Sequence, residues 1–401
     1  MAEFVVAATG SIPASRRFGD RFLDGDHTPT IQAAIDALPT AGGTVRILAG
    51  NYTLKRTDGK EYCVLVNKAN VRLLFEPGAV LKLADNQFDG VAGRMFLCEL
   101  STGLTNVSFW GPGTLDWNKA NNTGLSGATN NTIIYVNSLA SDSAGPTRVT
   151  IGGGLSLINC FGDGLRCRAT TTQPGSELFI DHLSIRNCGE GMLIQTYDDV
   201  RILNVVIDDI DKEDGLELMQ CKNVVVTNCI ITDVNQSAID DLADNIGGAR
   251  DNEFHTYSNC VLGPTRGSTA VVKIGDTPDA DDCVHTSLIG CKVIMSGGSC
   301  TQGIRLGLDE FAGTGLTKHT LIAHTIIDGT GAAAGADGIA VRAEATHTFI
   351  TGNLIHDCPG HAIEADDDPT PLHIVGNSGW DNTGGGISGA VGAVTADNNF
   401  V

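Results

Sequence analysis

A short pattern that returns along the middle of the chain constrains the fold more than any other feature. In each copy a polar residue and a small residue precede alternating apolar and variable positions, which is typical of a short strand with one buried face. The small residue stands at 164, 191, 215 and 238, so the copies are 27, 24 and 23 residues apart. A strand-bearing repeat with a period in the twenties predicts a solenoid. The copies are Asp163-Gly164-Leu165-Arg166-Cys167-Arg168, Glu190-Gly191-Met192-Leu193-Ile194-Gln195, Asp214-Gly215-Leu216-Glu217-Leu218-Met219 and Ser237-Ala238-Ile239-Asp240-Asp241-Leu242.

The same pattern continues downstream with small residues at 270, 303, 338, 362 and 386. The steps widen to 32, 33 and 35 residues and then return to 24 and 24, which indicates loops inserted into a regular repeat. The 50 glycines and the many Val, Ile, Thr and Asn residues suit short strands joined by tight turns. We therefore predict one all-β domain over residues 1–401, with a cap at residues 1–43 and coils at residues 44–401.

The segment before the first coil predicts a short amphipathic helix. Thr28 is a candidate N-cap and Pro29 suits the first helical position. Ile31 and Ile35 fall on one face of the helix, and Pro39 ends it. Such a helix would cover the open end of the first coil, whose strand edges otherwise invite association. Residues 4–8 and 18–24 are expected to be extended.

The charge and the cysteines exclude several classes of protein. A net charge of −21 argues against binding to nucleic acid and to anionic membranes. No segment is long enough to span a bilayer, and the N-terminus lacks the basic region of a signal peptide. The 12 cysteines contain no Cys-x-x-Cys pair, and several stand at equivalent points of the repeat, so we interpret them as apolar fillers rather than as disulfides or metal ligands.

Four segments toward the N-terminus carry a resemblance to a known superfamily. The segments at residues 30–38, 42–45 and 49–54 resemble the opening of the pectin-lyase-like superfamily, and the turn at residues 111–117 is similar to one that precedes its catalytic coils. The resemblance implies a single-stranded right-handed parallel β-helix. The superfamily includes polygalacturonases, alginate lyases and epimerases, and phage tailspike depolymerases. Trp117 in that turn would either stack on a sugar or pack against its own loop.

Alignment of the coils predicts a face of outward side chains on which carboxylates of successive coils lie about 4.8 Å apart. Stacked carboxylates repel, so one of a pair should hold a proton while its neighbour stays ionised, which is the arrangement that glycosidic hydrolysis uses. We predict Asp214, Glu217 and Asp240 as acid and base, with Glu190 and Glu213 in reserve. The alternative is that Asp-Gly before a strand is turn chemistry alone. The predicted substrate-binding residues are Tyr135, Asn137, Arg166, Arg168, Gln195 and Arg305.

The same face leaves a lyase or an epimerase open. Such an enzyme neutralises a uronate with cations and removes the adjacent proton. Arg166, Arg168 and Arg305 could supply the charge, with Ca²⁺ if the reaction is elimination; hydrolysis would need no cofactor. Glu213-Asp214 and Arg305 resemble polygalacturonase motifs, but the histidine of that family is absent. In the predicted register Lys273 points inward toward Asp241.

The histidines show no metal-ligand spacing, and we predict no metal site; His361, which precedes a repeated strand, is a candidate to line the groove. The favoured function is a polysaccharide-degrading glycoside hydrolase, followed by a uronate lyase or C5-epimerase. A catalytically idle glycan-binding phage tail protein or adhesin is the non-enzymatic alternative. The expected location is extracellular or on a phage particle, and the resemblance to tailspikes makes a homotrimer an option.

Overall fold

The computed structural model describes most of the chain. The described residues are 2–7, 27–88, 91–100, 102–122, 131–138, 142–243, 250–267, 269–275, 281–307, 316–366, 371–389 and 394–401. The extended piece expected at residues 18–24 lies outside them. The described residues form two compact units, Met1–Leu193 and Ile194–Val401, called here the N-terminal and C-terminal units. The single domain expected over residues 1–401 stays a prediction.

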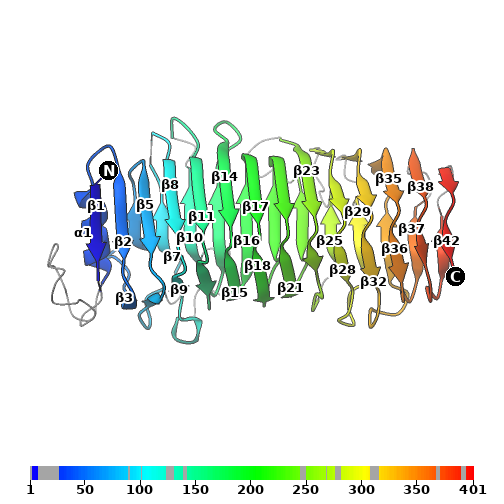
Figure 1. Cartoon of the computed structure of the whole chain (residues 1–401), viewed down its shortest axis with the longest axis horizontal. Coiled ribbons are helices and arrows are strands. Elements are labelled where there is room, and N and C mark those ends of the chain that lie inside the picture. Colours follow the sequence, from blue (N-terminus) through cyan, green and yellow to red (C-terminus); the bar gives the residue numbers. More distant parts are fainter. Residues whose placement is uncertain are drawn as a thin grey trace. The chain divides into compact units, whose positions relative to one another are not determined.

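In the N-terminal unit each coil contributes one strand to each of three parallel sheets (Figure 1). Sheet A holds β1 (Ala2–Val6), β2 (Gly43–Ile47), β5 (Val71–Phe75), β8 (Thr105–Trp110), β11 (Thr147–Gly152) and β14 (Gly175–Asp181). Sheet B holds β3 (Gly50–Leu54), β6 (Ala79–Leu83), β9 (Thr114–Asp116), β12 (Ser156–Ile158) and β15 (Ser184–Cys188). Sheet C holds β4 (Tyr62–Val66), β7 (Gly93–Cys98), β10 (Asn131–Asn137) and β13 (Asp163–Arg168), and β16 (Glu190–Gln195) spans the boundary of the units.

The C-terminal unit repeats this arrangement. Its sheet C holds β19 (Leu216–Met219), β22 (Ile239–Leu242), β25 (Ala270–Ile274), β29 (Gln302–Leu306), β33 (Asp337–Val341), β37 (His361–Ala365) and β40 (Gly385–Ser388). Its sheet B holds β18 (Val206–Ile210), β21 (Ile230–Val234), β24 (Val261–Leu262), β28 (Lys292–Ile294), β32 (Ile326–Asp328), β36 (Leu354–His356), β39 (Ser378–Gly379) and β42 (Asn399–Phe400). Its sheet A holds β17 (Tyr197–Leu203), β20 (Lys222–Thr227), β23 (Asn252–Ser258), β26 (Cys283–Val284), β27 (Ser287–Ile289), β30 (Thr317–Lys318), β31 (Leu321–Ala323), β34 (Ala345–Thr346), β35 (Thr348–Thr351), β38 (Leu372–Val375) and β41 (Val394–Ala396).

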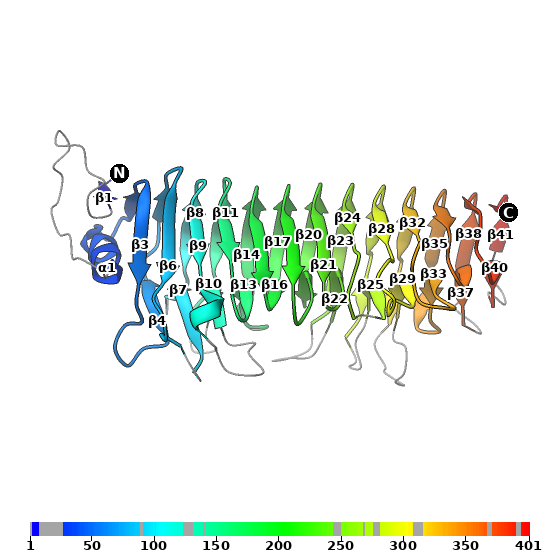
Figure 2. The same cartoon turned by 90° about the horizontal axis from the view of Figure 1, so that it is seen from below.

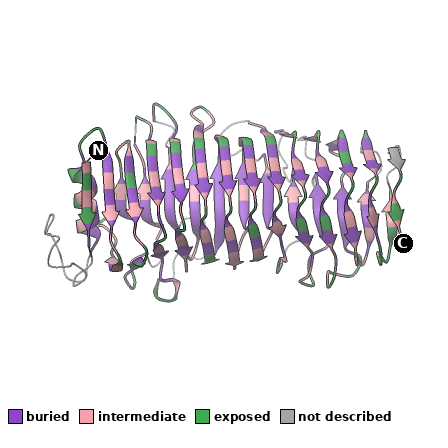
Figure 3. Cartoon of the chain, in the orientation of Figure 1, coloured by how far each residue is buried: buried purple, intermediate pink, exposed green. Residues whose placement is uncertain are grey.

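The alternation in the sequence explains why these coils stack. On sheet C of the C-terminal unit, Leu216 is in register with Ile239 and then with Val272, and all three side chains are fully buried. The strands therefore present a buried stripe inward, while exposed residues gather at the turns (Figure 3). Crossovers between parallel strands of one sheet are right-handed as a rule. The right-handed parallel β-helix is confirmed as the fold.

The helix that precedes the first coil is confirmed as a cap. Helix α1 (Thr28–Ala37) lies beside β1, β2 and β4 (Figure 2), with Ile31 and Ile35 fully buried. Its N-cap position is His27, one residue earlier than the sequence predicts. The Gln32 side chain accepts a hydrogen bond from Leu65 N at 2.8 Å and donates one to Leu65 O at 3.1 Å. These bonds occupy polar groups at the edge of β4, which would otherwise be open to another strand.

Two further expectations concern single side chains. All 12 cysteines are free and buried, as the filler interpretation predicts. Trp117 is fully buried and stacks on Phe88 with ring centroids 5.3 Å apart, so it packs within its own unit and is not available to stack on a sugar. In the described part of the chain no helix has the length and apolar character needed to cross a membrane.

Candidate functional site

Sheet C of the C-terminal unit carries a row of charged side chains on its outer face. Four members follow one another in register on β19, β22, β25 and β29: Glu217, Asp240, Lys273 and Arg305. The register then reaches the apolar Ala340 on β33. Successive members lie on strands about 4.8 Å apart. The row therefore places two acidic side chains directly beside two basic ones, and we call it the charged row.

The direction of Lys273 corrects the sequence-based register. The sequence predicts that Lys273 points inward to pair with Asp241 and that Val272 points outward. Instead Val272 is in register with the inward Ile239, and Lys273 Nζ lies 3.3 Å from Asp240 Oδ2 on the outer face. The prediction was one residue out of step, because a run of three apolar residues on β25 contains no alternation from which the facing can be read.

Asp214 lies just before β19, close to the charged row, and its acidity is strongly altered. Its carboxyl group is almost fully buried, and its Oδ1 accepts a hydrogen bond from Ser237 N at 2.6 Å. The pKa of Asp214 is raised to about 7, and burial is the largest cause. Lys273 and the Ser237 N–H lower this pKa, and the negative charges of Glu217 and Glu213 raise it. A substantial fraction of Asp214 is thus protonated at neutral pH.

The other predicted acids have different surroundings. Glu217 is half-buried at the end of the charged row. Glu213 is half-buried and accepts a hydrogen bond from the Gln236 amide. Asp240 is almost fully buried, and the ammonium of Lys273 compensates its charge. The group therefore combines one acid with a raised pKa, Asp214, with one carboxylate, Asp240, that lies next to a cation.

Two predicted binding residues of the C-terminal unit are less accessible than the sequence suggests. Arg305 is only 4% exposed, and its Nη1 lies 3.5 Å from Thr269 Oγ1. Gln195, at the end of β16, is also almost fully buried. Arg305 still adjoins Lys273 in the charged row, so it contributes positive charge to that face.

The N-terminal unit holds a second cluster of predicted residues. Arg166 Nε lies 2.6 Å from Asp163 Oδ2, and Arg166 Nη2 lies 3.6 Å from Glu190 Oε2. Asp163 Oδ2 also accepts a hydrogen bond from Thr132 Oγ1 at 3.2 Å. Both carboxylates are almost fully buried. In this cluster one guanidinium lies against both acids and offsets one of their two negative charges, which favours a structural role for the arginine.

The remaining predicted binding residues lie on β10 and β13 of the N-terminal unit. Tyr135 is in register with Arg166, and the guanidinium of Arg94 lies 5.2 Å from the centre of the Tyr135 ring. Asn137 Nδ2 donates a hydrogen bond to Glu99 Oε2 at 2.8 Å. Arg168, in register with Asn137, is exposed. The residues of the expected patch belong partly to the N-terminal unit and partly to the C-terminal unit.

The sequence missed a polar network inside the C-terminal unit. Asp241 points inward from β22 into an otherwise apolar column. Its Oδ2 accepts hydrogen bonds from His255 Nδ1 at 2.9 Å and from Tyr257 OH at 2.7 Å, and its Oδ1 accepts one from Asn252 Nδ2 at 2.7 Å. His255 Nε2 lies 2.9 Å from the carbonyl oxygen of Cys221, so both ring nitrogens have a partner.

All four side chains of this network, Asp241, Asn252, His255 and Tyr257, are fully buried. Because a carbonyl only accepts, His255 donates from Nε2, and donation from Nδ1 to the carboxylate makes it an imidazolium. The only indication of this network in the sequence is that Asp241 falls at an inward position. The predicted register paired Asp241 with Lys273, which is wrong. The sequence of β23 does not show which of its side chains face inward, so it does not predict that His255 is buried.

His361 and Asp337 reproduce the turn of Asp214 in a later coil. Asp337 precedes a glycine, as Asp214 does, and its Oδ1 accepts a hydrogen bond from His361 N at 2.6 Å. The His361 Nδ1 also lies 3.3 Å from that oxygen. In both coils the aspartate therefore accepts a hydrogen bond from the backbone of the next coil, and the alternative that Asp-Gly is turn chemistry alone stays a prediction. Asp214 differs because it stands beside the charged row.

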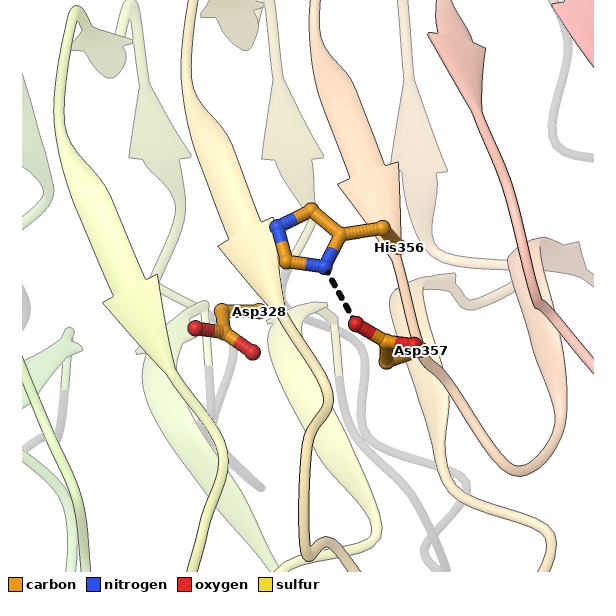
Figure 4. A group of neighbouring side chains, drawn as sticks. All are labelled: Asp328, His356 and Asp357. Carbon is orange, nitrogen blue, oxygen red and sulfur yellow. Dashed lines mark hydrogen bonds and ion pairs between the residues drawn. The ribbon is translucent and has the colours of Figure 1, made fainter.

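Metal-ligating side chains come together on sheet B rather than at the charged row. Among the described residues one group has its ligand atoms within 4.8 Å of one another: Asp328, His356 and Asp357 (Figure 4). Its spacing of 28 residues between the first two members equals one coil, which the sequence did not reveal as a ligand pattern.

Comparison with known proteins yields structural relatives only. No protein-family model matches the chain, and no curated protein matches it either. The A-module of the mannuronan C-5 epimerase AlgE4 from Azotobacter vinelandii is similar in structure, with a TM-score of 0.66 and 19% identity over 94% of this chain and 93% of that one. The AlgE6 A-module from the same organism has a TM-score of 0.50 and 18% identity, covering 94% and 95%.

A phage protein is similar as well. The tailspike of E. coli bacteriophage HK620, in complex with a pentasaccharide, has a TM-score of 0.54 and 14% identity over 94% of this chain. The chain spans 62% of the tailspike, less than two thirds of its length. At these identities the comparisons establish the fold.

Proposed function

We propose that this chain, which has the right-handed parallel β-helix fold of the pectin-lyase-like superfamily, binds and cleaves a polysaccharide at the charged row. The favoured reaction is hydrolysis of a glycosidic bond. Asp214 would act as general acid and protonate the leaving oxygen, with Asp240 or Glu217 as the ionised partner that activates water or attacks the sugar.

The observation that carries this proposal is the contrast among neighbouring carboxyl groups. Asp214 has a pKa of about 7 because it is buried and lies near Glu217 and Glu213. Asp240 is paired with Lys273 at 3.3 Å. Two carboxyls whose environments separate their protonation states are what a glycosidase requires. No cofactor enters this mechanism.

The basic half of the charged row supports a second candidate, elimination or C5-epimerisation of a uronate polymer. Lys273 and Arg305 adjoin each other in register beside Asp240. Cations there would neutralise the substrate carboxylate and make its neighbouring proton more acidic, and a carboxylate would remove that proton. Mannuronan C-5 epimerase modules are among the structural relatives of this chain. Ca²⁺ is an option for this reaction only.

One assay separates these reactions. The full chain is incubated with acidic and neutral polysaccharides, with and without chelator, while reducing ends, absorbance of unsaturated uronates and the ¹H NMR spectrum of the polymer are followed. New reducing ends without absorbance support hydrolysis. Absorbance indicates elimination, and a changed uronate ratio without chain cleavage indicates epimerisation. Binding without any of these changes favours the non-enzymatic alternative, a glycan-binding phage tail protein or adhesin.

Asp214→Asn tests the acid directly, because an amide cannot donate the proton. We expect turnover to fall by about 10²- to 10⁴-fold, the usual contribution of a general acid. Asp337→Asn is the matched control, since Asp337 accepts the same backbone hydrogen bond in another coil but lies outside the charged row. If both variants lose turnover equally, the role of Asp214 is in the turn and the mechanism is wrong.

The proposed substrate also implies a location and an assembly. Polysaccharides of this kind lie outside cells, so we propose an extracellular or phage-associated protein. A homotrimer is proposed as its assembly by analogy with tailspikes, and light scattering on the purified chain checks this.

A further inference from the structure

Two strands of sheet B in the C-terminal unit bring an aspartate and a histidine together. Asp328 ends β32 and His356 ends β36, and the two residues are in register on neighbouring parallel strands. Side chains at paired positions point to the same face of a sheet. Asp357 follows in the left-handed conformation, with φ of 57°, and its Oδ2 lies 2.8 Å from His356 Nδ1. Figure 4 shows the imidazole between the two carboxylates.

An aromatic side chain also packs against the ring of His356. The indole of Trp380 stacks on it with centroids 4.7 Å apart and planes 4° from parallel. The side chain of His356 keeps 15% exposure, and those of Asp328 and Asp357 keep 22% and 38%. The group is thus oriented in advance and still open to solvent.

Thr330 orients both carboxylates from the turn after β32. Its backbone N–H donates to Asp328 Oδ1 at 3.1 Å, and its hydroxyl donates to Asp357 Oδ2 at 3.3 Å. Hydrogen bonds of this kind around ligand side chains fix their direction and raise metal affinity. Lys292 Nζ, 3.8 Å from Asp328 Oδ2, offsets one negative charge, so two carboxylates, a neutral imidazole and the lysine sum to −1.

We propose that Asp328, His356 and Asp357 form a binding site for a divalent transition-metal ion, with Zn²⁺ as the expected occupant. One imidazole nitrogen and two carboxylate oxygens are ligands that zinc accepts, and three protein ligands leave a position for water. Ca²⁺ fits less well, because it takes six to eight oxygen ligands. The ion would take the place of the hydrogen bond between His356 and Asp357, with the imidazole proton on the ring nitrogen that does not bind the ion, and it would join two neighbouring coils.

The full chain, freed of metal with a chelator and returned to buffer, is titrated with ZnCl₂ in competition with a chromogenic zinc indicator. We expect one equivalent of Zn²⁺ per chain and no comparable binding of CaCl₂. His356→Gln, Asp328→Asn and Asp357→Asn should each weaken binding by about tenfold or more. Zinc should also raise the melting temperature of the unaltered chain and leave that of the variants unchanged.

Two control variants make this test specific. Asp381 occupies the same left-handed turn position as Asp357 one coil later, with φ of 53°. His319 belongs to an exposed stack with His285 and His347, the other place where imidazoles gather among the described residues. Asp381→Asn and His319→Gln should bind zinc as the unaltered chain does. The proposal is overturned if the chain binds no zinc, if the three ligand variants bind it normally, or if His319→Gln alone abolishes binding. Circular dichroism without zinc shows whether each variant is folded.

Discussion

Asp240 and Asp241 are neighbours on β22, yet they have opposite surroundings. Asp240 faces outward in the charged row, where Lys273 Nζ lies 3.3 Å away. Asp241 faces the interior, where His255, Tyr257 and Asn252 hold its two oxygens at 2.7–2.9 Å. The outer carboxylate lies against the long, flexible side chain of a lysine, whereas the inner one is enclosed by three short contacts. The same residue type is therefore held beside a cation on the outer face and by a set of short hydrogen bonds in the interior.

The comparison also teaches which charges a β-helix tolerates. A charge in the core costs several kcal/mol of desolvation, and only a complete set of hydrogen bonds and an opposite charge offset that cost. The Asp241 network meets this condition through His255. We infer that it fixes how β22 and β23 pack, since alternative arrangements would leave a buried charge without partners.

The largest expected effect in this comparison is on stability. Asp241→Asn leaves the buried imidazolium without its counter-charge, so we expect the free energy of unfolding to fall by about 3–5 kcal/mol. Asp240→Asn should cost about 1.5 kcal/mol or less, because Lys273 still has Asp214 as an acidic neighbour. Urea unfolding followed by circular dichroism measures both. Equal losses would remove the distinction between the inner and outer aspartates.

The pH dependence of stability sharpens the comparison. Burial lowers the pKa of His255, but the charge of Asp241 and its hydrogen bond outweigh burial, so the pKa lies above its ordinary value of 6.5. A histidine with a raised pKa adds stability that is complete below about 6.5 and is lost as pH rises through the pKa of the folded state. The unfolding free energy should therefore decrease as pH rises above 6.5.

His255→Gln provides the control for this pH dependence. The variant should be less stable overall, and its unfolding free energy should vary less with pH above 6.5. Asp214 acts in the same direction, because its raised pKa lets the folded state hold a proton up to about pH 7. The difference in pH dependence between the unaltered chain and His255→Gln therefore measures the contribution of His255 to the unfolding free energy. An unchanged slope would mean that His255 is neutral and that the network is held without a charge pair.

The smallest expected effect is a shift in the pH profile of turnover. If Asp214 donates the proton, kcat should fall as pH rises through about 7. Lys273 lowers the pKa of Asp214 and Glu217 raises it, so Lys273→Gln should move this limb to higher pH and Glu217→Gln to lower pH. Both kcat profiles are measured with the best substrate found. Shifts in the same direction for both variants would contradict the role of Asp214.

Much of the fold follows from the chain itself, because period and alternation are local properties. A repeat in the twenties with strands and small residues predicts a solenoid, and the helix at residues 28–37 follows from its apolar stripe and from Pro29 and Pro39. The sequence pattern does not show which side chains of β25 point inward. Ala270, Val271 and Val272 are all apolar, so only pairing with β22 decides that Lys273 points outward.

The sequence by itself determined that this protein is a stack of short parallel strands and that carboxylates gather before and on one of its sheets, because both are written in the spacing of residues along the chain. Only the tertiary structure decided which of them share surroundings. Asp214 owes its pKa of about 7 to burial and to Glu217, Glu213 and Lys273. Asp328 meets His356 because one coil is 28 residues long at that point. Electrostatic and ligand contacts act through space over a few ångströms, and the length of each coil sets which distant residues come that close.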